Sequence, residues 1–296
     1  MTFSCPILRI AGVVLLVGMA FTAAGCNKNG NSTPTAPSGP PAAGSTVNYS
    51  AIGASDAWGV GASVQCATDC SSGTGYVFVT ERALRAQGFT VNLNLLAAPT
   101  STIGPDFQSL GNQYGHFVLA NLLAFAPFVT SNATLVTIFA GGNDVEVIMS
   151  ALGGGAGANN QAAFIDSQVQ AFGVDYKALI AAVRAQSSTA RIIVLNLPNF
   201  AGIPLHSGDP LPNRQAVQRA SVGMTTSVIN PLASQNIGVI DLMCDPRFYQ
   251  GANFSSDGFH PNDSGYAIMS SLIVQAVSSA SYPAPAASCS QMSLVP

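Results

Sequence analysis

Residues 134–145, "TLVTIFAGGNDV", hold the pattern that decides the fold: an apolar run that ends in glycines and polar residues. The run is rich in Val, Ile and Leu and carries no charge. Continuous apolar runs of this length are typical of strands buried on both faces of a sheet. We therefore predict a strand over 134–142, and the same pattern returns at four other places. Those places are 46–53, 90–97, 191–198 and 237–242.

Helical patterns separate these predicted strands, at 75–88, 162–186, 214–235 and 263–280. An alternation of strand and helix along the chain predicts a parallel sheet with helices on both faces. Residues 46–296 then form one domain, at the upper end of the usual size. In such sheets ligands bind beyond the carboxyl ends of the strands. The residues that follow each apolar run are therefore the first place to look for function.

The composition narrows the function classes. Charged residues make up 8% of the chain, and the formal net charge is −3. The ten Lys and Arg are scattered, with no basic stripe to neutralise phosphates, so we expect no nucleic-acid binding. Neither a G-x-G-x-x-G nor a Gly-Lys-Ser/Thr element follows a strand, which excludes the common phosphate cradles. We expect a monomer without a cofactor.

Residues 1–26 have the pattern of an export signal: Arg9, then the apolar core "IAGVVLLVGMAFTAA", then small residues before Cys26. A transmembrane anchor is the alternative, but the core is short for one. The ending "TAAGC" resembles a bacterial lipobox, with Ala23 where that pattern usually has leucine. We expect lipidation at Cys26, a flexible Pro/Gly/Ser-rich tether over 27–45, and anchoring to the bacterial cell envelope.

Export makes the remaining cysteines informative. Four cysteines in an oxidising compartment suggest two disulfides with three possible connectivities. Pairing neighbours in sequence is the simplest, and it joins Cys66 to Cys70 and Cys244 to Cys289. A zinc site is the competing interpretation, but it needs two closely spaced pairs and only one exists. We expect no metal site.

Polar residues that suit one reaction follow the predicted strands. Ser55 follows the first run, Asn143 the third, and Asp257 and His260 precede the last helix. Each of these alone is a common turn or cap residue. Together they suit acyl transfer to serine, in which a histidine removes the hydroxyl proton and an acid orients the histidine. A side-chain amide can stabilise the oxyanion that forms. We therefore predict a catalytic site at this rim.

The order of these residues also resembles the SGNH, or GDSL, hydrolases, over residues 46–281. The resemblance rests on Gly-x-Ser at Ser55, on "GGND" at 141–144 and on "DGFHPN" at 257–262. It implies a flavodoxin-like three-layer α/β/α sandwich with a five-stranded parallel sheet, and ester hydrolysis. It makes Ser55 the nucleophile, His260 the base and Asp257 its partner. Asn143 and the Ser55 N–H become oxyanion donors, with Gly142 beside them.

Two positions depart from the family pattern. Ala54 precedes the serine where the family usually has aspartate, and an acid follows instead as Asp56, whose family counterpart is structural. The second block, "NLLAAPTSTIG" (94–104), lacks the glycine whose N–H is the third oxyanion donor. Pro99 has no N–H. Thr100 fits the register best, and Ala97 is the alternative.

The sequence therefore predicts an exported serine esterase acting on a small-molecule, lipid or acetylated-sugar ester. The first alternative keeps the site but changes the outcome, to acyl transfer or polysaccharide deacetylation. The second is an inactive surface-binding lipoprotein, which the departures at Ala54 and Thr100 favour. Of the two other histidines, we expect His116 on a connecting helix and His206 in a loop at the rim, in reach of substrate.

Overall fold

The computed structural model describes residues 39–66 and 71–296. The predicted export signal, the lipidation site Cys26, most of the tether and Cys70 lie outside the described residues. No helix within the described ranges combines the length and apolar content needed to cross a bilayer.

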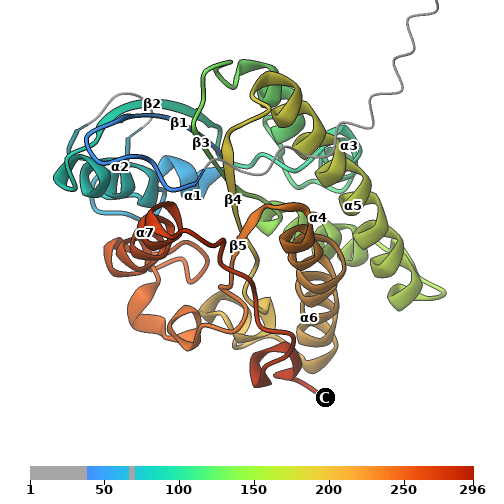
Figure 1. Cartoon of the computed structure of the whole chain (residues 1–296). Helices are drawn as coiled ribbons and strands as arrows, with labels where there is room; N and C mark the ends of the chain where they lie inside the picture. Colours follow the sequence, from blue (N-terminus) through green and yellow to red (C-terminus); the bar gives the residue numbers. More distant parts are fainter. Residues whose placement is uncertain (1–38, 67–70) are drawn as a thin grey trace, which may run out of the picture. The chain divides into compact units, whose positions relative to one another are not determined.

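A five-stranded parallel sheet forms the centre of the domain, as predicted (Figure 1). The strand order is β2-β1-β3-β4-β5, and every pair of neighbours is parallel. The strands are β1 (Thr46–Gly53), β2 (Thr90–Ala97), β3 (Leu135–Phe139), β4 (Arg191–Leu195) and β5 (Gly238–Ile240).

Helices cover both faces of the sheet (Figure 1). One face packs against α1 (Ser55–Trp58), α2 (Tyr76–Ala86) and α7 (Asp263–Ser278). The other packs against α3 (Pro105–Gln113), α4 (Gly142–Gly153), α5 (Gln161–Gln186) and α6 (Leu211–Met224). Short 3-10 turns fill the connections: η1 (Leu122–Phe128), η2 (Phe200–Gly202), η3 (Pro204–His206), η5 (Asn230–Gln235), η6 (Pro246–Tyr249), η7 (Gly251–Asn253) and η8 (Ser290–Ser293).

The apolar runs explain the three layers. Side chains of a strand alternate between the two faces of a sheet. In β4, Ile192 and Val194 enter the core on the α5 side, whereas Ile193 and Leu195 enter the core on the α7 side. All four are fully buried. A strand that must fill two cores cannot alternate apolar with polar residues, which is why the interior strand β4 has an unbroken apolar run over 192–195, whereas the edge strand β2 carries Asn92 and Asn94.

Two predicted helical segments differ in the structure. The segment predicted as one helix over 214–235 is α6, then a π-helical turn η4 (Thr225–Ile229), then η5. Pro231 lies in η5 and has no N–H to continue the α-helical ladder. The placement of His116 on a helix was wrong: α3 ends at Gln113, and His116 lies in the loop that follows. Gly115 has φ +77°, which ends the helical path before this histidine.

The cysteine prediction is confirmed for the pair that the structure describes. Cys244 and Cys289 form a disulfide with Cα atoms 5.7 Å apart. Cys66 is also disulfide-bonded, but its expected partner Cys70 falls in the gap between the two described ranges. The Cys244–Cys289 bond joins the loop after β5 to the C-terminal segment.

The strand register brings three distant segments to one edge. Gly53 of β1 is paired with Ala97 of β2 and with Phe139 of β3, so these three strands end in one row. Ser55, Thr100 and Asn143 follow this row within two to four residues. The carboxyl edge of the sheet therefore gathers the residues that the sequence predicted to act together.

Candidate active site

Ser55 is the first residue of α1, immediately beyond the end of β1. Its backbone turns sharply there, and the turn depends on Gly53. A Cβ at Gly53 would lie 2.7 Å from the Ala57 side chain and 3.2 Å from the Phe139 carbonyl oxygen, so no larger residue fits. Ser55 is 5% exposed. The turn thus fixes a buried serine at the edge of the sheet.

The structure brings Ser55, His260 and Asp257 into one hydrogen-bonded series. His260 Nε2 lies 2.9 Å from Ser55 Oγ, and His260 Nδ1 lies 2.6 Å from Asp257 Oδ2. The proton on Nδ1 is donated to the carboxylate, which leaves the lone pair of Nε2 to accept from the serine hydroxyl. This is the geometry in which a histidine can remove a serine proton.

Backbone and side-chain donors hold Asp257 in place. Its Oδ1 accepts from the N–H groups of Phe259 and His260, both at 2.9 Å, and from Ser255 Oγ at 2.8 Å. Partial burial would raise the pKa of Asp257, but the hydrogen bonds from His260, Phe259 and Ser255 outweigh it and lower the pKa to about 2. Asp257 is therefore a carboxylate at every pH at which the protein would work.

Asn143 lies in the first turn of α4, which begins directly after β3. Gly141 makes that change of direction possible: its φ is +120°, and a Cβ there would lie 2.8 Å from Leu197. The Asn143 Nδ2 group donates one hydrogen to the Ser101 carbonyl at 2.8 Å. An amide nitrogen carries two hydrogens, so the second is available to a ligand.

Thr100 has φ +62°, a left-handed conformation that favours glycine. This is the position where the sequence pattern has threonine in place of the expected glycine, and the backbone keeps the glycine-like shape. Its Oγ1 accepts from the Leu119 N–H at 3.0 Å, which supports the conformation. Within residues 39–66 and 71–296 the Thr100 N–H donates to no protein acceptor.

Two small cavities adjoin these residues. One, of about 10 Å³, has room for one water and is lined by Ala54, Asp56, Ser101, Gly142, Asn143 and Phe259. The other is about 30 Å³, mostly apolar, and shares Asp56, Gly142 and Phe259 with the first. Gly142 helps to keep this space open, since a Cβ on it would make a tight contact of 3.3 Å with the Phe259 ring.

Asp56 is the acid that follows Ser55 in place of the one that usually precedes it. Asp56 is among the residues that line both small cavities. Burial raises the pKa of Asp56, and the nearby His260 partly opposes that rise. The side chain of Asp56 is therefore more easily protonated than an exposed aspartate.

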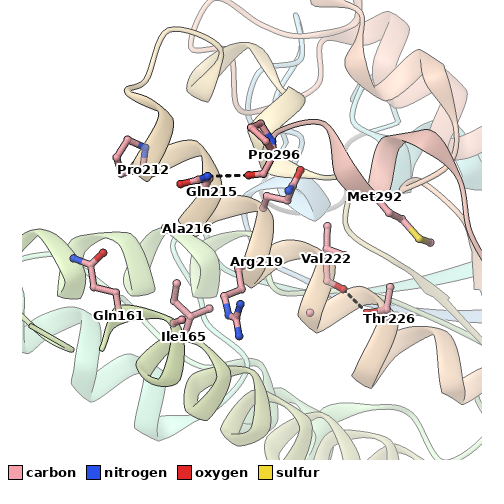
Figure 2. A pocket seen from close by; sticks show the side chains of 13 residues that line it. Gln161, Ile165, Pro212, Gln215, Ala216, Arg219, Val222, Thr226, Met292 and Pro296 are labelled. Atoms are coloured by element: carbon pink, nitrogen blue, oxygen red, sulfur yellow. Dashed lines mark hydrogen bonds between the residues drawn. The ribbon is translucent and has the colours of Figure 1, made fainter. Parts of the chain in front are cut away.

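A larger pocket of about 570 Å³ lies elsewhere, between α5, α6 and the C-terminal segment (Figure 2). Its lining contains amides and apolar side chains, and Gln215 on its wall donates a hydrogen bond to the Pro296 carbonyl at 2.8 Å. Arg219, its one charged side chain, is paired with Asp166 at 2.6 Å. The pocket holds no nucleophile with an adjacent base, so size alone does not make it the active site.

His206 is placed differently from the expectation of substrate contact. It is 6% exposed and lies between two carboxylates, with Nε2 2.9 Å from Glu146 Oε1 and Nδ1 2.8 Å from Asp209 Oδ2. Sequence reasoning did not single out Glu146 or Asp209, because Glu146 lies 60 positions from the histidine and no motif links them. In the described part of the chain, no cluster of three or more His, Cys, Asp or Glu side chains could hold a metal ion.

The comparisons with known proteins agree with this architecture. Two solved structures share the fold: a lipase from a goat rumen metagenome and an extracellular lipase from Streptomyces rimosus, both with TM-score 0.54. They are 19% and 17% identical to the chain, cover 78% and 79% of it, and are themselves covered over 97% and 100% of their lengths. No curated protein matches the sequence.

A family model supplies the assignment that these distant structures cannot. The model of the GDSL-like lipase/acylhydrolase family, a family of ester hydrolases, matches residues 51–268. The match spans the end of β1, the four other strands, both sides of the Ser55–His260 contact, and the first six residues of α7. The chain therefore belongs to the GDSL-like lipase/acylhydrolase family.

Proposed function

We propose that the protein is a serine esterase that hydrolyses carboxylic esters at Ser55. The observation that carries this proposal is the continuous series from Ser55 Oγ through the His260 ring to Asp257 Oδ2, with contacts of 2.9 and 2.6 Å. Membership of an ester-hydrolase family supports the reaction class. The residue roles are inferred from the geometry and the motifs.

In the first half of the reaction, Ser55 Oγ attacks the carbonyl carbon of the ester while its proton passes to His260 Nε2. The imidazolium that forms is stabilised by the Asp257 carboxylate. The tetrahedral intermediate then collapses, the bond to the alcohol oxygen breaks, and that oxygen takes the proton from Nε2. The products of this half are the free alcohol and an acyl group on Ser55.

In the second half, water attacks the acyl carbon and gives its proton to His260 Nε2. The bond to Ser55 Oγ breaks, the proton returns to that oxygen, and the carboxylic acid leaves. The oxyanion in both halves receives hydrogen bonds from donors fixed in advance: the second amide hydrogen of Asn143 and the N–H groups of Ser55 and Thr100. Their fixed positions lower the barrier because they need no reorganisation during the reaction.

The test is covalent labelling. A fluorophosphonate probe should label the full chain at Ser55, and Ser55→Ala should abolish both the label and ester hydrolysis, by about 10⁴-fold or more. Wild-type turnover in a correctly folded Ser55→Ala variant would rule out the mechanism. An unlabelled wild-type chain would favour the inactive surface-binding alternative.

Acyl transfer and polysaccharide deacetylation remain the alternatives at this site. They share the acyl intermediate on Ser55 and differ in the acceptor or in the substrate. A hydrolysis screen over acyl lengths from acetyl to palmitoyl, together with acetylated sugars, separates these outcomes. Product analysis in the presence of a second alcohol distinguishes hydrolysis from transfer.

We further propose that the mature protein is anchored to the cell envelope through a lipid on Cys26. The support is the sequence alone, namely the apolar signal and the "TAAGC" ending. Metabolic labelling with a fatty-acid analogue should mark the wild type and leave Cys26→Ser unmarked. Equal labelling of both would overturn the anchor.

A further inference from the structure

A second histidine–carboxylate cluster lies close to the candidate active site. It consists of His206 with Glu146 and Asp209, and we call it the His206 clamp. Both ring nitrogens lie within 3 Å of a carboxylate oxygen, at 2.9 and 2.8 Å. A neutral imidazole has only one N–H, so one nitrogen would then present a lone pair to a carboxylate. Only the imidazolium satisfies both contacts.

The surroundings favour that charged form. Burial by itself lowers the pKa of His206, but the hydrogen bonds and charges of Glu146 and Asp209 outweigh it and raise the pKa above its ordinary value. Because both nitrogens are occupied, His206 can act neither as a general base nor as a metal ligand. Its available role is to join the elements that supply the carboxylates.

Those elements are the ones that carry the candidate site. Glu146 is on α4, one turn after Asn143, so the clamp is attached to the helix that presents the amide. Asp209 and His206 are in the loop over 203–209. Leu205 of that loop donates its N–H to the Gly258 carbonyl at 3.0 Å. Gly258 follows Asp257 and has φ +71°, and a Cβ there would lie 2.8 Å from the Leu205 nitrogen.

A series of ring contacts runs in parallel with this backbone bond. The His206 ring stacks on Phe200 with centroids 6.4 Å apart and an interplanar angle of 27°. Phe200 meets Phe259 edge to face at 5.7 Å, and Phe259 meets His260 edge to face at 4.9 Å. The position of the His260 ring is therefore supported, through two phenylalanines, by the ring held in the clamp.

We propose that His206 is a positioning residue: as an imidazolium between Glu146 and Asp209, it holds the 203–209 loop against Gly258. The clamp thereby fixes the Asp257–His260 turn relative to the helix that carries Asn143. This inference rests on the proposed function, because its kinetic consequence needs an active serine site.

The clamp predicts a loss of activity at high pH. When His206 loses its proton, Glu146 and Asp209 remain as two carboxylates around a neutral ring. Other charged or titratable groups face the clamp from neighbouring elements. The charge of Glu146 also acts on His116, whose Nδ1 lies 3.4 Å from the Ser150 hydroxyl on α4. Arg214 of α6 donates to the Ala201 carbonyl, and His260 and Asp257 lie on the far side of Phe259 from the clamp. None of these replaces the hydrogen bonds of the imidazolium, so the loop loosens.

The decisive experiment records kcat and KM against pH for the full chain and for Glu146→Gln and Asp209→Asn. Each variant removes one negative charge beside His206, which should move the high-pH limb of kcat to lower pH by about one unit or more. The low-pH limb of kcat serves as an internal reference and should stay in place. Asp166→Asn is the matched control, since it removes a carboxylate from an exposed ion pair with Arg219. Identical high-pH limbs in all four proteins would overturn the proposal.

Amide hydrogen exchange tests the clamp independently of turnover. In His206→Gln at fixed pH, the amides of Leu205, Phe259 and His260 should exchange about tenfold faster or more, as expected when a local opening becomes easier. Glu146→Gln provides the same measurement if His206→Gln does not fold. Unchanged exchange in a folded variant would show that the clamp does not hold the turn. A wild type without esterase activity would defeat the proposed function and the kinetic role, whereas unchanged exchange defeats the clamp alone.

Discussion

His260 Nε2 lies 2.9 Å from Ser55 Oγ, although 205 positions separate the two residues in the chain. Ser55 is fixed by the end of β1, and His260 by the loop that leads into α7. The two elements meet because α7 packs on the same face of the sheet as α1 and α2. A hydrogen bond of this geometry therefore depends on the whole domain being folded.

Asp257→Asn should keep the fold and reduce kcat by about 10⁴-fold. The amide oxygen can still accept from the backbone of Phe259 and His260 in place of Oδ1. The NH₂ group would then face His260 Nδ1 as a donor, which favours the tautomer with its proton on Nε2, the wrong nitrogen for accepting from Ser55. Steady-state kinetics with a circular dichroism control checks this, and full activity in the variant would mean that Asp257 is only a turn residue.

Asn143→Ala should lower kcat by about 10²–10³ with little change in KM, because the amide meets a charge that develops only in the transition state. The variant also loses the hydrogen bond to the Ser101 carbonyl. Thermal unfolding must therefore accompany the kinetics. A loss confined to KM would point instead to a substrate-positioning role for Asn143.

Thr100→Gly should leave kcat within about threefold of the wild type, since the expected donor is the backbone N–H, which glycine retains. Glycine adopts φ +62° without the steric strain of a β-branched residue, worth roughly 1–2 kcal/mol. That gain is offset by the lost hydrogen bond from Leu119 and by the flexibility of glycine in the unfolded chain. If the variant lost a hundredfold in kcat at unchanged stability, the threonine side chain would be the functional group.

How much the sequence could predict is clear from particular segments. The runs at 46–53 and 90–97 match β1 and β2 at both ends, although Asn48, Asn92 and Asn94 interrupt them and β2, at the edge of the sheet, is only partly buried. The four side chains of the proposed mechanism also stood out, since a serine after the first strand, an asparagine after the third and an Asp-x-x-His before the last helix suit one reaction. The distances between these side chains in the folded protein could not be predicted from the sequence.

The sequence did not reveal α3 and α4 or the His206 clamp. The helix α4 begins with Gly142, Asn143 and Asp144, which on their own suggest a turn. The helix α3 is only nine residues long and contains Gly111, so its helical pattern is weak. Tertiary packing forms these helices in spite of weak local preference. The clamp joins residues 60 positions apart through a buried histidine and a partly exposed carboxylate, and no periodicity carries that information.

The Cys244–Cys289 disulfide should contribute measurably to stability. It closes a loop with a sequence separation of 45 residues, for which loop-closure entropy gives about 4 kcal/mol as an upper value. The double variant Cys244→Ser, Cys289→Ser should unfold at lower urea concentration, with a loss of about 2–4 kcal/mol in the free energy of unfolding. Mutation is preferable to a reducing agent because Cys66 is disulfide-bonded too. An unchanged midpoint would mean that the C-terminal segment is held by its other contacts.

Asp144, next to Asn143, should make stability fall as pH rises. It is fully buried, its Oδ1 accepts from the Ile103 N–H at 2.9 Å, and its Oδ2 has no hydrogen-bond partner within the described chain. Burial raises the pKa of Asp144 from 3.8 to about 7, the Ile103 N–H opposes that rise, and nearby Asp175 adds to it. The folded protein therefore keeps a proton on Asp144 between pH 4 and 7, where the unfolded chain has already released it.

Between these pH values the native state binds more protons at this site than the unfolded state, so the free energy of unfolding decreases with pH, by about 1.4 kcal/mol per unit. The full effect is on the order of 4 kcal/mol. Asp144→Asn keeps an oxygen for the Ile103 N–H and cannot titrate. Urea unfolding at a series of pH values should therefore show a flatter profile for Asp144→Asn than for the wild type between pH 4 and 7. The exposed variant Asp166→Asn should follow the wild type over the same range. Parallel profiles for the wild type and Asp144→Asn would mean that Asp144 is ionised in the folded protein, with a bound water or a structural change supplying the partner that its Oδ2 lacks.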